Sequence, residues 1–200
     1  MLLGRLPQQF LHCPQCILIK LGLVCHMENS TPIPEASPDM IATLAGYGLF
    51  MVNWSLFEAT IEVAIQKRLE LHPIEGNIVT GGLAFLSRSS ILRSLLALDD
   101  TDDAKEASTL INSMVNDANR NAIIHGIVHV GGDHTLKFVH RKTANKLTAK
   151  SVIVDKDSML SRASTLRKSI EKLQSLLSVS NEELQEFGNI GQLLANKSST

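Results

Sequence analysis

The chain contains few cysteines, and all of them lie near its beginning. Cys13, Cys16 and Cys25 fall within the first 26 residues, and the rest of the 200-residue sequence has none. Small extracellular domains that depend on disulfides carry a dense, even-numbered set of cysteines. The sequence therefore excludes a disulfide framework and favours a protein of the reducing cytoplasm.

Long apolar runs and a strong net charge are also missing. The best membrane candidate, residues 16–25, is short and interrupted by Lys20, whereas a membrane helix needs about 20 apolar residues. We therefore expect no membrane span. The net charge of −1 means that any attraction to nucleic acid must be local. Hydrophobic residues make up 44% of the sequence, enough to bury a core in one domain with tails or in two small domains.

The first 26 residues differ in character from the rest. The pairs Cys13-Pro-Gln-Cys16 and Cys25-His26 offer four ligands that zinc accepts, as in a zinc knuckle. The segment between the pairs is short and apolar, which argues against a zinc loop. A simpler interpretation is that Met27 is the true start and that residues 1–26 are a misassigned extension.

The sequence divides into three parts. Residues 28–38 carry three prolines and predict an unstructured segment. We therefore expect a disordered leader over residues 1–38 and a helical domain over residues 39–178. A short helix and a flexible tail are expected over residues 179–200.

The helical domain begins at a helix-start pattern. In Ser37-Pro38-Asp39 a capping hydroxyl precedes a proline in the first turn and an acid that faces the positive end of the helix dipole. The helix is expected to run to about Leu71, before His72-Pro73. Apolar residues recur every three or four positions and predict one buried stripe: Phe50, Trp54, Phe57, Ile61 and Ile65. Glu58 lies beside this stripe.

Two more helices are expected between residues 76 and 126. One covers roughly residues 76–98, with Thr80-Gly81-Gly82 as its weak point. The other begins at the cap Thr101-Asp102-Asp103 and ends at Gly126. Its apolar stripe leads to His125 and places that side chain toward the core or toward a partner.

The last third of the chain predicts two further helices. One opens at Asp157, with apolar positions at heptad-like spacing: Ala163, Leu166, Ile170, Leu173 and Leu177. The sequence Ser180-Asn-Glu-Glu183 is a capping box, and it predicts a short final helix that ends at Gly188.

Between the third and fourth helices the periodicity changes from helical to alternating. Residues 127–130, 135–141 and 148–154 predict short strands, with Gly131-Gly132-Asp133 as a hairpin turn. The predicted fold is mainly α, a bundle of four to five helices with a small three-strand insert after the third helix.

The most informative motif is Arg120-Asn121-Ala122-Ile123-Ile124-His125-Gly126. Arginine suits phosphate binding because its planar fork of donors is always charged. Histidine, with a usual pKa of about 6.5, exchanges protons near neutral pH. The two side chains suit chemistry on a phosphodiester that needs no metal or other cofactor. At about 100° per residue, Arg120 and His125 point about 140° apart on one helix, so a neighbouring protomer or a distorted helix end is needed to bring them together.

The spacing Arg120-Asn121-x-x-x-His125 at the end of a helix resembles the motif of the HEPN superfamily. The upstream segment Trp54-Ser55-x-Phe57-Glu58 is similar to the first long helix of many bacterial HEPN-like proteins. This resemblance covers roughly residues 39–178 and implies a dimeric helical bundle whose two motifs meet at the interface. Many members are metal-independent ribonucleases of toxin–antitoxin or other defence systems, and others are binding modules without activity.

Three further groups of residues are candidates for supporting roles. Asn121 matches the polar position that follows the arginine of the motif, and Glu58 either orients Arg120 or forms an ordinary ion pair. A basic run without acids predicts contacts to the RNA backbone, carried by Lys137, Arg141, Lys142 and Lys146. Lysines also protect exposed strand edges from aggregation, which is the alternative interpretation of this run. His125 and His129 lack a carboxylate that would complete a metal site, so no metal is expected.

These observations favour a metal-independent RNA endonuclease with Arg120 and His125 as its catalytic pair. The expected partners are a second copy of the chain, RNA and an antitoxin protein. The alternative is a non-catalytic helical dimer that binds nucleic acid, a nucleotide or a protein. A DNA-binding helix-turn-helix is disfavoured because no short basic recognition helix is present.

Overall fold

The computed structural model describes residues 37–117, 119–131, 133–144 and 146–197. They belong to one compact unit, Ser37–Thr200. The predicted leader before Ser37, the cysteine pairs and the alternative start at Met27 lie outside the described residues. The elements follow one another as α2 (Pro38–Arg68), α3 (Pro73–Gly81), α4 (Phe85–Leu96), α5 (Asp102–Val115), α6 (Arg120–His125), β1 (Ile127–Val130), β2 (Leu136–Ala144), β3 (Lys146–Val154), α7 (Lys156–Leu177) and α8 (Asn181–Lys197). The mainly α class is therefore confirmed.

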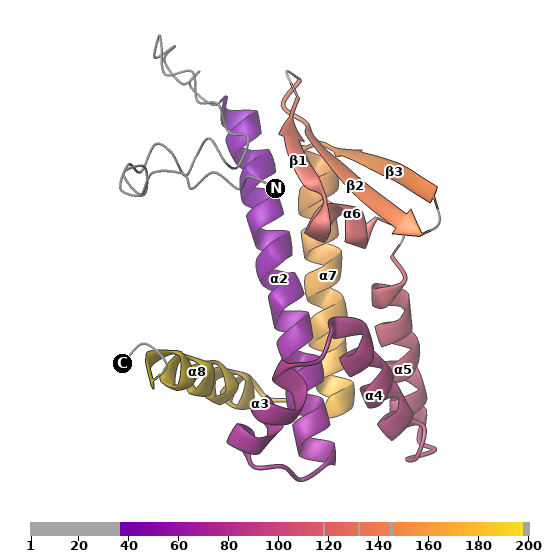
Figure 1. Cartoon of the computed structure of the whole chain (residues 1–200), viewed down its shortest axis with the longest axis vertical. Helices are drawn as coiled ribbons and strands as arrows, with labels where there is room; N and C mark the ends of the chain where they lie inside the picture. The colour runs from indigo at the N-terminus through magenta and orange to yellow at the C-terminus, as the bar shows by residue number, and fades with distance from the viewer. Residues whose placement is uncertain (1–36, 118, 132, 145, 198–200) are drawn as a thin grey trace, which may run out of the picture. The chain divides into compact units, whose positions relative to one another are not determined.

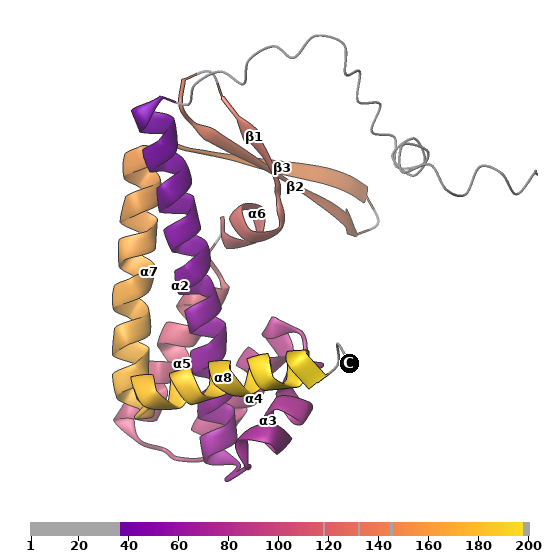
Figure 2. The same cartoon turned by 90° about the vertical axis from the view of Figure 1, so that its left-hand side faces the viewer.

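Helices α2 and α7 run side by side and in the same direction (Figures 1 and 2). At their first turns Lys156 Nζ donates to Asp39 Oδ1 at 2.9 Å, and midway Asn53 Nδ2 donates to the carbonyl oxygen of Ala163 at 2.9 Å. At their far ends Lys67 Nζ donates to the carbonyl oxygen of Ser178. Parallel neighbouring helices need a long connection, and the elements from α3 to β3 supply it.

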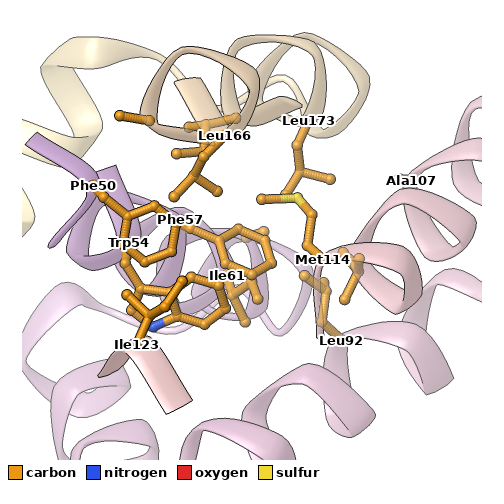
Figure 3. Packing of buried hydrophobic residues seen from close by; sticks show 14 of the residues in the cluster. Phe50, Trp54, Phe57, Ile61, Leu92, Ala107, Met114, Ile123, Leu166 and Leu173 are labelled. Carbon is orange, nitrogen blue, oxygen red and sulfur yellow. The ribbon is translucent and has the colours of Figure 1, made fainter. Parts of the chain in front are cut away.

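The core lies between α2 and α7 and is closed by α4, α5 and α6 (Figure 3). The predicted stripe of α2 is confirmed, because its five side chains are each 4% exposed or less. The predicted stripe of α7 is also buried, in the same core cluster as Leu92 of α4, Ile111 of α5 and Ile123 of α6. Burying one such large apolar side chain contributes about 1.5–3 kcal/mol to the free energy of unfolding.

Side-chain caps fix where the long helices begin. Ser37 Oγ accepts from the backbone N–H of Met40 at 3.2 Å, and Asp155 Oδ1 accepts from that of Ser158 at 2.8 Å. The capping box at Ser180 forms as predicted, with reciprocal bonds to Glu183 of 2.7 and 3.2 Å. These caps satisfy N–H groups that a helix cannot pair internally.

The helix that starts at this box is longer than expected. It continues through Gly188 to Lys197, so its predicted end at Gly188 is wrong. Leu184 and Phe187 pack against the core, and this packing exceeds the cost of about 1 kcal/mol for a glycine inside a helix.

Two other predicted helices are each divided in the structure. The expected helix over residues 76–98 is two helices, α3 and α4, separated near Gly81-Gly82 at the weak point noted above. The expected helix from residue 101 to His125 ends at Val115 as α5, and a six-residue helix, α6, follows. The described residues thus contain seven helices rather than four to five, and the strands follow α6.

Asn116 and Asp117 mark the break between α5 and α6. Asn116 caps the end of α5, and Asp117 Oδ1 accepts from the backbone N–H of Asn119 at 2.9 Å. Such local bonds compete with the i→i−4 bonds of a helix. The chain therefore turns before Arg120 and starts a new helix there.

The three strands form an antiparallel sheet in the order β1-β2-β3, close to the predicted positions (Figure 1). Leu136 of β2 pairs with Val154 of β3, and Phe138 pairs with Val128 and Val152 on its two sides. Leu136, Phe138 and Val154 are buried. The sheet is thereby joined to the core, and its β2 and β3 strands contact α6.

Helix α2 is also long and apolar enough to cross a membrane, judged by its length and composition alone. The core helix of a soluble protein has the same properties, and α2 carries the central stripe of this core. Within the described part of the chain, it is the one helix with this composition.

Candidate functional site

Helix α6 carries both ends of the motif and directs them to different environments. Arg120 is 4% exposed, whereas His125, at the other end of the helix, is exposed. Ala122 and Ile123 are buried and hold α6 against the core, while Asn121 is exposed. The divergence expected from helix geometry is therefore present, and one protomer does not bring the guanidinium and the imidazole to a common surface.

Two aromatic rings that contact each other pack against the guanidinium of Arg120. Its Cζ lies 4.3 Å from the ring centroid of Trp54 in α2 and 4.4 Å from that of Phe85 in α4. Nη1 donates to Asn121 Oδ1 at 3.0 Å. Desolvated cation–π contacts of this kind contribute up to about 2 kcal/mol or more. The structure thus joins the side chain of Asn121 to that of Arg120 by a hydrogen bond.

The charge of Arg120 is not fully compensated. Its Nε is buried and has no hydrogen-bond partner within the described residues. Burial lowers the pKa of Arg120, and the negative charge of Glu58 raises it in part. Arginine stays ionised in proteins. The site therefore holds a desolvated positive charge with a free donor, which an anion would stabilise.

Glu58 acts on Arg120 through its charge and makes its direct bonds elsewhere. Its Oε1 accepts from Trp54 Nε1 at 2.6 Å, and its Oε2 lies 3.1 Å from Arg88 Nη2. The ion-pair interpretation of Glu58 thus holds, with Arg88 as the partner. Because Trp54 also stacks on Arg120, Glu58 fixes the ring that covers the guanidinium.

Arg88 links Glu58 to a second carboxylate that sequence reasoning missed. Arg88 Nη1 also pairs with Glu62, and Glu62 Oε2 accepts from Thr80 Oγ1 at 2.8 Å. The side chains of Arg88 and Glu62 are 13% and 10% exposed. The signal in the sequence is the pair Glu58 and Glu62, one turn apart at the start of the stretch of α2 in which residues 60–66 are all buried. Carboxylates in such a place need a cation.

A cavity of about 280 Å³ lies against Arg120, between α2, α5 and α7. One side is apolar, and Figure 3 shows Phe50, Trp54 and Leu166 close together there. The other side is polar and includes Arg162, Asp117 and the hydroxyls of Ser161, Thr165 and Ser169. His125 does not line it. The arrangement fits a small ligand with a negatively charged group.

The predicted RNA-contacting residues lie on the sheet. Lys137 and Arg141 are exposed and alternate with the buried Phe138, so they share the outer face of β2. The backbone of Lys142 lies in β2 and that of Lys146 in β3, on the two sides of the hairpin. The structure does not bring Lys137 and Arg141 into the cavity beside Arg120.

The two histidines considered as metal ligands are not on one helix. His125 ends α6, and His129 lies in β1 opposite Lys137. Among the described residues, no three histidine, cysteine, aspartate or glutamate side chains gather as a possible metal site.

Comparisons of the chain with protein-family models, with curated proteins and with solved structures find no match. The resemblance to the HEPN superfamily thus depends on the motif at Arg120 and His125 and on the order of the helices.

Proposed function

We propose that the chain is a metal-independent RNA endonuclease whose site is completed by a second copy of the chain. The observation that carries the proposal is the division of the motif. Arg120 is held inside one protomer and faces a cavity, whereas His125 is exposed at the end of α6. Since both must act on one phosphate, His125 of one copy would meet the cavity of the other. A two-fold symmetric dimer would form two such sites.

In this site His125 would accept the proton of the ribose 2′-hydroxyl or donate one to the leaving oxygen. Arg120 would stabilise the negative charge on the pentacoordinate phosphorus. Asn121 and Glu58 support Arg120, the first by its hydrogen bond and the second by its charge. Lys137, Arg141, Lys142 and Lys146 would contact the RNA backbone outside the site. By resemblance, the proposal extends to a toxin or defence role with an antitoxin as partner.

The first test is RNA cleavage in EDTA by the wild type, His125→Ala and Arg120→Lys. Proton transfer by one positioned group accounts for about 10²–10⁴-fold in rate, so His125→Ala should lose at least about 10²-fold. Arg120→Lys should also fail, because an ammonium cannot reproduce the fork of donors. DNA should resist cleavage because it lacks the attacking hydroxyl. Cleavage that EDTA abolishes, or that survives His125→Ala, contradicts the mechanism.

The second test is whether the two inactive variants restore activity when mixed. After subunit exchange, about half of the dimers are mixed, and each contains one site with both residues intact if the site is shared between protomers. The mixture should then recover about one quarter of the wild-type rate. A site contained in one protomer gives no recovery, and circular dichroism confirms that both variants remain folded.

A non-catalytic binding module is the second candidate, and the burial of Arg120 favours it. A guanidinium of a side chain that is 4% exposed, packed against both Trp54 and Phe85, is suited to anchor a bound anion. This candidate predicts retained ligand binding with no cleavage of any RNA. The same set of reactions therefore separates the two candidates.

A further inference from the structure

We propose that the cavity beside Arg120 binds the phosphate group of a small phosphomonoester, with the organic part of the ligand against Phe50 and Trp54. The assignment rests on the proposed function in one respect, that the anion at Arg120 is a phosphate. It concerns binding, which is measured apart from cleavage, so the failure of either proposal can be recognised.

The wall formed by Arg120 supplies a fixed positive charge. Trp54 and Phe85, which also contact each other, both pack against the guanidinium, so little side-chain freedom is lost when a ligand binds. Its buried Nε has no acceptor within the described residues, and Glu58 directs its own oxygens to Trp54 and Arg88. The positive charge of Arg120 is therefore not fully neutralised by the protein, and the charge of a phosphate beside it would compensate for it.

Helix α7 contributes most of the polar residues that line the cavity. Ser161, Thr165 and Ser169 follow one another at a spacing of four and line the cavity from one face of the helix. Arg162 lines it as well, and its Nη1 lies 3.5 Å from Asp117 Oδ2. Strong charged hydrogen bonds are about 2.7–2.9 Å long, so Arg162 is only weakly engaged by Asp117. With Arg120, Arg162 and Asp117 in its lining, the cavity has a net positive charge, which suits an anion.

The remaining lining sets the size and nature of the ligand. Phe50, Trp54, Met114 and Leu166 form the apolar side. The volume of about 280 Å³ lies just below the range of about 300–1,000 Å³ that is usual for sites of drug-sized ligands. The cavity therefore fits a phosphate with one apolar or aromatic group, such as a mononucleotide or the phosphorylated end of a strand.

Calorimetry on the full chain tests the assignment with adenosine monophosphate, adenosine and inorganic phosphate. The monophosphate should bind more tightly than inorganic phosphate, and adenosine should not bind. An RNA oligonucleotide with a 5′-phosphate, compared with the same strand without it, shows whether the phosphomonoester is a free ligand or a strand end. Binding of neither the monophosphate nor the phosphorylated strand at millimolar concentration overturns the proposal.

Three variants of the cavity and its helix make the test specific. Arg162→Gln should weaken binding of the monophosphate at least about tenfold, since it removes a charged hydrogen bond. Asp117→Asn should strengthen binding, because it removes a like charge and releases Arg162. Arg167→Gln is the matched control, as Arg167 lies on α7 but pairs with Glu171 outside the cavity. Equal effects of Arg162→Gln and Arg167→Gln, or weaker binding by Asp117→Asn, overturn the proposal. Binding that meets these expectations without RNA cleavage sustains this site and rejects the ribonuclease.

Discussion

Arg88→Met should lower the free energy of unfolding more than the loss of an arginine from an exposed ion pair does. Arg88 pairs with Glu58 at 3.1 Å and also with Glu62, and both carboxylates extend from neighbouring turns of α2. Methionine keeps most of the volume of the side chain but removes its charge. The two carboxylates then face each other without their cation in a partly buried place.

The burial of these three side chains determines how much the free energy of unfolding falls. Removing one partner of a buried ion pair costs about 3–5 kcal/mol, because the other charge is left without compensation. Arg88 and Glu62 are nearly buried, whereas the side chain of Glu58 is 30% exposed and keeps some hydration. We therefore expect the lower limit of that range, about 3 kcal/mol. For a domain of this size the loss corresponds to about 6–12 °C in Tm.

Urea unfolding followed by circular dichroism measures the change, with Glu58→Gln and Glu62→Gln made in both backgrounds. In the Arg88→Met background each carboxylate substitution should restore part of the lost stability, whereas alone each should destabilise the protein. Arg167→Gln removes an exposed arginine that pairs with Glu171 and should change stability by less than about 1 kcal/mol. A loss below about 1 kcal/mol for Arg88→Met, or no recovery in the double variants, refutes the argument.

Two other substitutions test the junction after α6 and the start of the bundle. In Gly126→Ala the added Cβ would lie 2.1 Å from the carbonyl oxygen of Ala122, so urea unfolding should show a loss of about 1–3 kcal/mol. Gly48→Ala, which has open space, should instead be neutral or stabilising, and equal effects at the two glycines contradict the prediction. The hydrogen bond and charge of Lys156 lower the pKa of Asp39, so this pair stabilises the fold above the usual carboxylate pKa of about 4 and ceases to do so as pH falls through the lower folded value. Asp39→Asn should therefore be less stable than the wild type at pH 7 and equal to it near pH 2, and an equal difference at both pH values contradicts this.

The elements that sequence patterns predicted are those whose causes are local. The cap at Ser37, the stripe from Phe50 to Ile65 and the capping box at Ser180 each depend on residues within a few turns. The alternating strands after Gly126 are of the same kind. Gly126 itself ends α6 with φ at −79°, so a close approach to Ala122, and not a left-handed conformation, accounts for the glycine.

The parts that sequence patterns did not predict depend on distant partners. The cation–π contacts of Arg120 need Trp54 from α2 and Phe85 from α4, and the pairing of Glu58 needs Arg88 from 30 positions away. Helical periodicity contains no information on such contacts, because it reports which face is buried and not what covers it. The extension of α8 past Gly188 has the same origin, since packing of Phe187 against the core outweighs a weak local signal.

The break before Arg120 connects the fold to the proposed chemistry. Because α5 ends at Val115, the short α6 is free to bury Ala122 and Ile123 and to place Arg120 against Trp54 and Phe85. The same break leaves Asp117 beside Arg162, where it sets the charge of the cavity. The two ends of the motif therefore differ in exposure for separate reasons. Packing buries Arg120, whereas His125 is exposed because it is the last residue of the short α6. A dimer that uses both must place His125 of one copy at a cavity that the other copy has already built, and the mixing of Arg120→Lys with His125→Ala measures whether it does.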